Sequence, residues 1–168
     1  GTAWTLDSGT GPDDLFTVVS SEGEVVVFKG TDPTSASSWA IVGVYYVGKP
    51  LGRRCFTKLA GDVSLMTENG VFPLSRVLQT GSVNFASALT NKIQPTFTAA
   101  TADTGVTAAR WECCVYPQWD ALIMNVPAGL FNTSIRQYVM NTTTGALCSF
   151  SGWNATCFEV YEGQLYFG

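Results

Sequence analysis

Three stretches of the chain superpose without gaps, and this internal repeat limits the possible folds more than any other feature. They are "RRCFTKLAGDVSLMT", "WECCVYPQWDALIMN" and "ATCFEVYEGQLYFG". One cysteine of each stretch falls in the same register: Cys55, Cys113 and Cys157. Each lies seven residues before an Asp or Gln that opens an alternating apolar run. Self-similarity of this kind is typical of architectures in which repeated units pack on their neighbours.

The region before these stretches repeats their later half. In "PDDLFTVVSSEGEVVVF", an alternating strand follows Asp14, and a polar turn at residues 20–23 leads into a second strand. In "GDVSLMTENGVFPLS", the pair Asn69-Gly70 predicts a two-residue hairpin loop with positive φ at both residues. The segment "YVMNTTTGALCSF" repeats the pattern, with residues 143–145 as its turn.

The spacing of the units predicts the architecture. The residues that open the apolar runs are Asp14, Asp62, Asp120 and Gln164, which lie 48, 58 and 44 residues apart. Short antiparallel strands repeating every 40 to 50 residues or so are typical of β-propeller blades. We therefore expect one all-β domain over residues 1–168, with about three propeller-like blades and part of another. Because the last unit stops early, we expect the chain to be part of a longer propeller, or to be completed by a partner.

Residues 84–104 lengthen one interval and predict a helical insertion between blades. Its apolar residues recur at spacings of three and four: Phe85, Leu89, Ile93, Phe97 and Ala100. Pro95 should kink this helix or begin a second one, and residues 103–105 should end it. Such an insertion either covers an exposed sheet edge or docks on a partner, and the sequence leaves both alternatives open.

The cysteines predict buried thiols. Their number, five, is odd and their positions are scattered, which favours free thiols made in a reducing compartment over a disulfide framework. The repeated cysteines are expected to pack between adjacent blades. No cysteine pair has CxxC spacing and the chain has no histidine, so we predict no metal site.

Charge and hydropathy argue against two classes of partner. Only 13% of the residues are charged and the net charge is -4. The densest positive group is Arg53 and Arg54 with Lys49 and Lys58 nearby, which is too small for phosphate-driven nucleic-acid binding, and we interpret it as a solvated strand entry. No apolar run reaches the 18 or so residues of a membrane span, so no membrane insertion is expected.

The sequence offers no catalytic constellation. Three pairs of acids are close in sequence: Asp13 with Asp14, Glu22 with Glu24, and Glu159 with Glu162. Each pair flanks a predicted turn, which favours solvated carboxylates over a catalytic dyad. Without histidine, a Ser-His or Cys-His nucleophile pair is impossible, and no Gly-rich phosphate loop is present. We predict a non-enzymatic protein with no catalytic, cofactor-binding or metal residues.

Several longer strings carry a resemblance that covers nearly the whole chain. They are "EVVVFKGTDPTSASSWAIVGVYYVGKPLGRR", "GDVSLMTENGVFPLS", "ALTNKIQP", "ALIMNVP" and "QYVMNTTTGALCSFSGWNATCFEVYEGQLYFG". They resemble a family of tailed-phage and prophage virion structural proteins. The resemblance implies a propeller-bearing tail component, similar to the nozzle or tail-tube proteins that assemble as rings around a DNA conduit. The slightly acidic balance would suit a lumen that DNA must traverse without binding. Members of the family it resembles are typically several times longer than this chain.

Two functional hypotheses follow. The first is a structural module of a phage or prophage tail, made in the bacterial cytoplasm, that binds other virion proteins and forms homo-oligomers. The alternative is a carbohydrate- or receptor-binding propeller, in which Trp4, Trp119 and Tyr161 would stack on sugars. We favour packing between blades for these aromatic residues. Trp39 and Trp153 recur directly after predicted strands, as core residues would.

Overall fold

The computed structural model describes residues 1–7, 12–81, 84–104, 110–128 and 134–168. Most of these residues are in β-strands, which form four antiparallel sheets that follow one another along the chain. The predicted all-β class with antiparallel sheets is confirmed. Among the described helices, none is long and apolar enough to cross a membrane.

Each sheet is a meander whose strands pair in chain order. The first sheet contains β1 (Thr2–Asp7), β2 (Pro12–Val19), β3 (Glu24–Gly30) and β4 (Trp39–Tyr46). The second contains β5 (Phe56–Leu59), β6 (Asp62–Thr67) and β7 (Gly70–Pro73). The third contains β8 (Glu112–Tyr116), β9 (Ala121–Ala128), β10 (Ser134–Asn141) and β11 (Leu147–Phe150). The fourth contains β12 (Phe158–Tyr161) and β13 (Gln164–Phe167).

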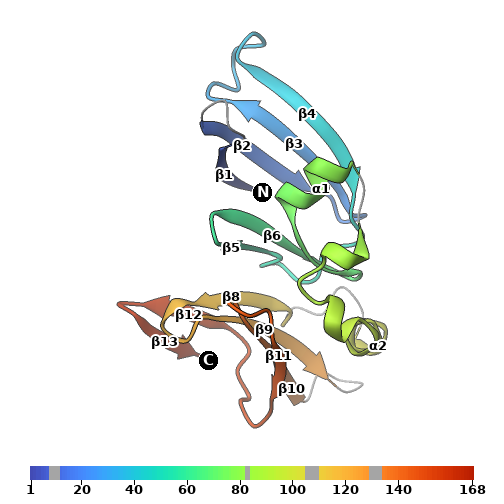
Figure 1. The fold of residues 1–168 in the computed structure, drawn as a ribbon, viewed down its shortest axis with the longest axis vertical. Helices are drawn as coiled ribbons and strands as arrows, with labels where there is room; N and C mark the ends of the chain where they lie inside the picture. The colour runs from blue at the N-terminus through green and yellow to red at the C-terminus, as the bar shows by residue number, and fades with distance from the viewer. Residues whose placement is uncertain (8–11, 82–83, 105–109, 129–133) are drawn as a thin grey trace.

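The sheets follow one another along the longest axis of the molecule (Figure 1). The first sheet occupies one end, the third and fourth sheets occupy the other, and the second lies between them. Arg54, which lies just before β5, forms a parallel bridge with Glu112 in β8, so the first strands of the second and third sheets run close together. Sheets of four, three, four and two strands correspond to the predicted number of units.

The repeated cysteines mark hairpins of identical register. Cys55 lies opposite Met66, Cys113 opposite Met124, and Cys157 opposite Gly168. In the second and fourth sheets, the turn between the first two strands is made by residues 60–61 and 162–163, all of which have positive φ. Two consecutive positive φ values are the geometry of the tight hairpin turn that suits the twist of the strands. The ungapped alignment therefore corresponds to one strand pairing that all three hairpins share.

The repeated positions nevertheless pack in opposite directions along the chain in the second and third sheets. In the second sheet, Leu65 packs with the first sheet and Met66 with the third. The matching residues of the third sheet are exchanged, since Ile123 packs with the fourth sheet and Met124 with the second. The register is the same in the two sheets, so the exchange lies in which neighbouring sheet each face of the hairpin packs against. The alignment predicts register but not the direction of the side chains.

The predicted turns are present at the expected positions, but the backbone conformation of one of them differs from the prediction. Turns connect β2 to β3 and β10 to β11 where expected. Thr67 pairs with Gly70, so the predicted hairpin between β6 and β7 is present. The prediction of positive φ at both Asn69 and Gly70 is wrong, because among these two residues only Gly70 has it, at 136°. A Cβ atom at Gly70 would lie 2.7 Å from the Thr90 hydroxyl, so glycine is also required sterically.

A short helix that the sequence did not predict replaces a fourth strand in the second sheet. α1 (Leu74–Thr80) follows β7 directly and buries Leu74 and Val77. The Asp62 carboxylate, at the start of β6, accepts a hydrogen bond of 2.6 Å from the Ser75 hydroxyl, and it also accepts from the Ser75 N–H. The repeated Asp thus ties the start of α1 to its own sheet.

The helical insertion over residues 84–104 lies between the second and third sheets, as predicted. It consists of two 3-10 turns, η1 (Phe85–Ser87) and η2 (Asn91–Ile93), followed by α2 (Gln94–Thr104). Pro95 begins α2 and does not kink it. Phe97 is buried against Trp111, with ring centroids 5.7 Å apart, whereas Phe85 is 51% exposed. The predicted apolar stripe is therefore buried along only part of its length.

This insertion covers a sheet edge. The Leu89 N–H donates a 2.8 Å hydrogen bond to the carbonyl of Val71 in β7. The Thr90 hydroxyl in turn accepts a 3.3 Å hydrogen bond from the Val71 N–H. β7 is the last strand of its sheet, so these bonds satisfy a backbone edge that would otherwise be open. The structure therefore supports a cover over a sheet edge, which was one of the two predicted roles, and not an arm that docks on a partner.

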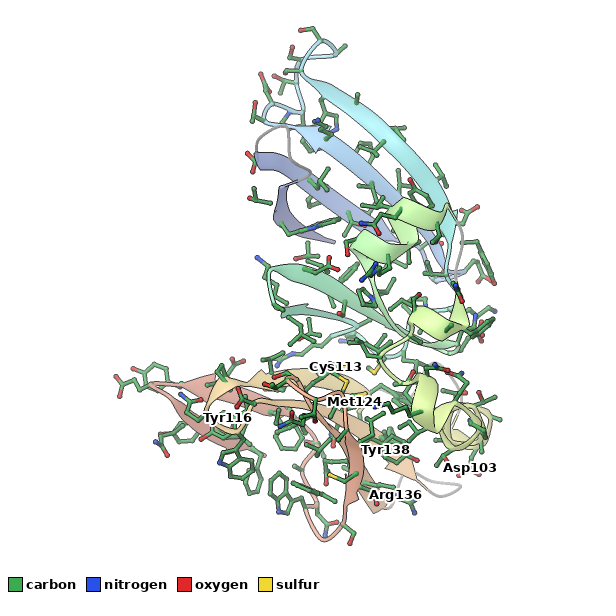
Figure 2. All side chains as sticks on the ribbon, viewed as in Figure 1. Asp103, Cys113, Tyr116, Met124, Arg136 and Tyr138 are labelled. Atoms are coloured by element: carbon green, nitrogen blue, oxygen red, sulfur yellow. The ribbon has the colours of Figure 1, made fainter. Side chains whose placement is uncertain are left out.

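The cores lie between successive sheets. One cluster joins the first and second sheets beneath α1, a second joins the second and third sheets beneath α2, and a third joins the third and fourth sheets. Figure 2 shows Cys113 and Met124 on the side of the third sheet that faces the second. The Cys113 thiol lies 3.5 Å from the sulfur of Met66 across this interface. Packing face to face is how each sheet buries its apolar side.

Candidate assembly surface and central cleft

The first strands of all four sheets meet at one cleft, which we call the central cleft. Its volume is about 690 Å³. β1 contributes Thr2, β5 contributes residues 56–57 after the entry segment 52–55, β8 contributes residues 112–115, and β12 contributes residues 158–160. In a β-propeller, the first strands surround the central channel in this way.

An ionic junction in the cleft joins three sheets. The Arg54 guanidinium donates a 2.8 Å hydrogen bond to the Glu112 carboxylate and lies 3.7 Å from the Glu159 carboxylate. The second Glu112 oxygen accepts a 3.3 Å hydrogen bond from the Phe158 N–H. The hydrogen bond to Glu112, and then the charge of that carboxylate, raise the pKa of Arg54 above its ordinary value. Glu112 is a buried carboxylate whose hydrogen-bond partners lie on neighbouring sheets. Its role is therefore structural, because it links these sheets to its own.

Sequence reasoning missed Glu112. It was not among the paired acids, because it stands alone within the apolar strand "ECCVY". An acid at such a position is rarely buried without a partner, and this was the available signal. The interpretation of Arg54 as part of a solvated strand entry is therefore incomplete, because its guanidinium is the partner of the buried Glu112 carboxylate.

The predicted acid pairs are not brought together as dyads. Asp14 is exposed on β2 and accepts a hydrogen bond from Thr5, while the side chain of Asp13 lies outside the described residues. Glu22 forms a 3.3 Å ion pair with Lys49. Glu159 faces Arg54, and Glu162 stands at a hairpin turn. Each described acid of these pairs is accounted for by a turn, a strand surface or a single basic partner.

The cysteines are free thiols, but their burial differs. Cys55 and Cys113 are buried between sheets, as predicted, whereas Cys148 and Cys157 are exposed, so the prediction of buried thiols is wrong at these two positions. Cys157 lies just before β12, in a sheet that has no following sheet in the described chain to pack against. Burial is the main cause that raises the pKa of Cys113 far above its ordinary value and that of Cys114 to about 11. These two thiols are protonated at neutral pH and are weak nucleophiles and metal ligands.

The aromatic residues considered for sugar binding are in different environments. Trp4 is 6% exposed and belongs to the core between the first and second sheets, which removes it from that role. Trp119 and Tyr161 are 53% and 63% exposed, so the prediction that they pack between blades is wrong for these two residues. Trp153 packs between the third and fourth sheets, as expected for a core residue, and stacks on Phe167 at 5.8 Å.

Trp39 does not lie between two of the described sheets. It stacks on Phe28, with centroids 5.5 Å apart and planes inclined by 18°, on the face of the first sheet that points away from the second. We call this side the outer face. Cross-strand pairing places the following apolar residues on it: Phe16, Val18, Val26, Phe28, Trp39, Ile41, Val44 and Tyr46. The sequence indicated apolar strands here but did not show that one face lacks a neighbouring sheet.

The outer face is most exposed along β4. Ile41 is 59%, Val44 60% and Tyr46 60% exposed, although all three are large and apolar. Single exposed apolar residues are ordinary, but contiguous apolar patches mark interaction surfaces. Asp14 and Glu24 also lie on this side, at its margins. β4 with the outer face is therefore the candidate assembly surface.

No protein-family model and no curated protein matches the chain.

Proposed function

We propose that the chain is a structural module of a tailed-phage or prophage tail, similar in role to nozzle or tail-tube proteins, and that it acts through protein–protein assembly without catalysis. The observation that carries this proposal is the apolar surface along β4 and the outer face, which has no partner within the described chain. The proposed location of this assembly in a virion tail rests on the resemblance of the sequence to virion proteins. Other tail proteins and further copies of the chain are its proposed partners.

The central cleft agrees with a structural role. Of its two arginines, Arg53 and Arg54, the second is engaged by two carboxylates, so it is not available to hold a phosphate backbone. Its cysteines are protonated or buried, which leaves them little reactivity. We therefore propose neither a specific nucleic-acid site nor an enzymatic reaction here.

The location can be tested on phage particles. Virions released from a bacterium that encodes this chain would be purified on a density gradient, analysed by peptide mass spectrometry, and labelled with an antibody raised against the chain. The proposal predicts peptides in the particle fraction at a constant ratio to the capsid protein, with label on the tail. Peptides confined to the particle-free fraction would contradict it.

A carbohydrate- or receptor-binding module is the second candidate. It is favoured by the exposure of Trp119 and Tyr161, because exposed aromatic rings can stack on sugar faces. A glycan array with the wild type, Trp119→Ala and Tyr161→Ala chains tests it. Binding that is lost in these variants and kept in Trp39→Ala would support this alternative, and absence of binding would remove it.

A further inference from the structure

β4 is an open edge strand that no charged residue or proline protects. It is the last strand of its sheet, and no other described strand pairs with its outer side. Its sequence, "WAIVGVYY", contains no charged residue and no proline. Natural proteins usually blunt exposed edges with such residues, because unpaired backbone groups bind other strands. Figure 1 shows β4 along the rim of the first sheet.

Side chains on β4 alternate in a way that a bulge modifies. Val44 lies opposite Val26 and Ile41 opposite Phe28, which places both residues on the outer face. Gly43 lies opposite the buried Val27 and faces inward. The register shifts between these two pairs, leaving Val42 as the extra residue. A bulge of this kind keeps Ile41 and Val44 on the same face although they are three residues apart.

This arrangement makes β4 complementary to itself. If two copies of the strand pair antiparallel about a two-fold axis between Val42 and Gly43, Ile41 meets Val44. In the same register, Trp39 meets Tyr46 and Ala40 meets Tyr45. Each pair joins residues that lie on the same face of the sheet. Cross-strand pairs of β-branched or aromatic residues stabilise antiparallel strands.

We propose that two copies of this chain associate through β4, pairing antiparallel so that their first sheets become one continuous sheet. This inference rests on the proposed assembly function and names the first contact of that assembly. The strand carries no charge, so a two-fold axis brings no like charges together within it. The joined outer faces form a single larger apolar surface.

Two other outermost strands of the described sheets, β11 and β13, fit β4 less well. Each spans four residues, whereas β4 spans eight, so either would leave half of β4 unpaired. β13 is also only the second strand of its sheet, next to β12 at the central cleft, whereas β4 is the outermost strand of a four-stranded sheet. A second β4 matches in length, in charge and in the placement of its apolar residues.

Sedimentation velocity over a hundredfold range of concentration tests the association. The wild type should shift from monomer to dimer as concentration rises. Ile41→Lys should abolish the shift, because it places two charges in the paired strands. Tyr166→Lys, on β13, is the matched control and should dimerise like the wild type. A wild type that stays monomeric, a dimer that survives Ile41→Lys, or a dimer lost only in the control would each overturn the proposal.

Disulfide trapping tests the register and does not depend on one variant folding well. In a Cys148→Ser, Cys157→Ser background, the double variant Ile41→Cys, Val44→Cys should form covalent dimers on mild oxidation, because the register places the two positions opposite each other. Either single variant should not, since a cysteine would then face the native residue of the partner. Equal cross-linking of single and double variants, or none in either, would contradict the register.

The failures of the two proposals can be told apart. Virion peptides found in particles whose isolated chain is monomeric would keep the tail function and remove the β4 dimer. A chain that is absent from particles but forms a dimer with the expected variant pattern would keep the β4 dimer and remove the tail function.

Discussion

β3 and β4 are neighbouring strands of similar apolar content in very different positions. β3 is paired on both sides, and its Val25 and Val27 are completely or almost completely buried. β4 is paired on one side, and its Ile41 and Val44 are mostly exposed. An apolar run such as "EVVVF" is typical of a strand covered on both faces, yet the described chain covers only one. The described residues therefore bury one face of the first sheet and leave the other exposed, and the proposed assembly rests on this difference.

The largest predicted difference comes from placing the same charge on each strand. Val27→Asp puts an unpaired carboxylate in the core and should reduce the free energy of unfolding by about 4 kcal/mol or more. Val44→Asp should cost less than about 1 kcal/mol, because its side chain stays in water. Urea denaturation of dilute samples measures both. Equal losses would show that β3 and β4 are equally buried, which would break the comparison.

In contrast to the open edge at β4, the first strands of the sheets are held together at the central cleft by the ionic junction of Arg54 with Glu112. Arg54→Met leaves the buried Glu112 carboxylate without its cation and should cost about 2 kcal/mol. The control is Arg53→Met, a change at the adjacent exposed residue, which should stay within about 0.5 kcal/mol of the wild type. The same denaturation series measures this pair. If both variants were equally stable, the ionic junction would have no role in joining the sheets.

Reactivity of the thiols should separate open surfaces from closed interfaces. Cys148 and Cys157 are exposed and should react first with a disulfide reagent at neutral pH, before the half-buried Cys114. Cys55 and Cys113 should react only when the fold opens, because they are buried between sheets. Mass spectrometry of labelled peptides at increasing times gives the order. Early labelling of Cys113 would mean that the interface between the second and third sheets is loose.

The smallest expected effect is a loss of stability in alkali. The pKa of Cys114 rises to about 11 in the folded chain from an ordinary value of 9.0, mainly through burial. Above about pH 9 the unfolded chain releases this proton while the folded chain keeps it, so stability falls as pH rises, up to about pH 11. Cys114→Ala should therefore lose less stability than the wild type between about pH 8 and about pH 10. The same loss in both chains would argue against a buried thiol.

The sequence predicted the fold well because its repeat is carried by local pairing. The hairpin register at Cys55, Cys113 and Cys157 depends on residues close in sequence, and it is the same in all three hairpins that the alignment superposed. Which face each residue occupies depends on the neighbouring sheets, and here the prediction failed for Cys157. α1 was missed because its start depends on the distant Asp62 carboxylate as well as on its own short sequence.

The candidate surface could be predicted only in part. The apolar strand around Ile41 and Val44 is visible in the sequence, but its position at a sheet edge follows from the strand order. The ionic junction of Arg54 with Glu112 joins residues 58 positions apart, so spacing gave no indication of it. Trp39 and Trp153 follow similar sequence signals, yet they differ in whether a neighbouring sheet covers them.

Hydrogen–deuterium exchange at low and high protein concentration tests the central claim most directly. The account predicts that backbone amides on the open side of β4 become protected as concentration rises, while those of β13 do not change. The Ile41→Lys chain should show no such protection at either concentration. Protection that appears along β12 and β13, or unchanged exchange in β4 at every concentration, would contradict the claim that this chain assembles through its outermost strand.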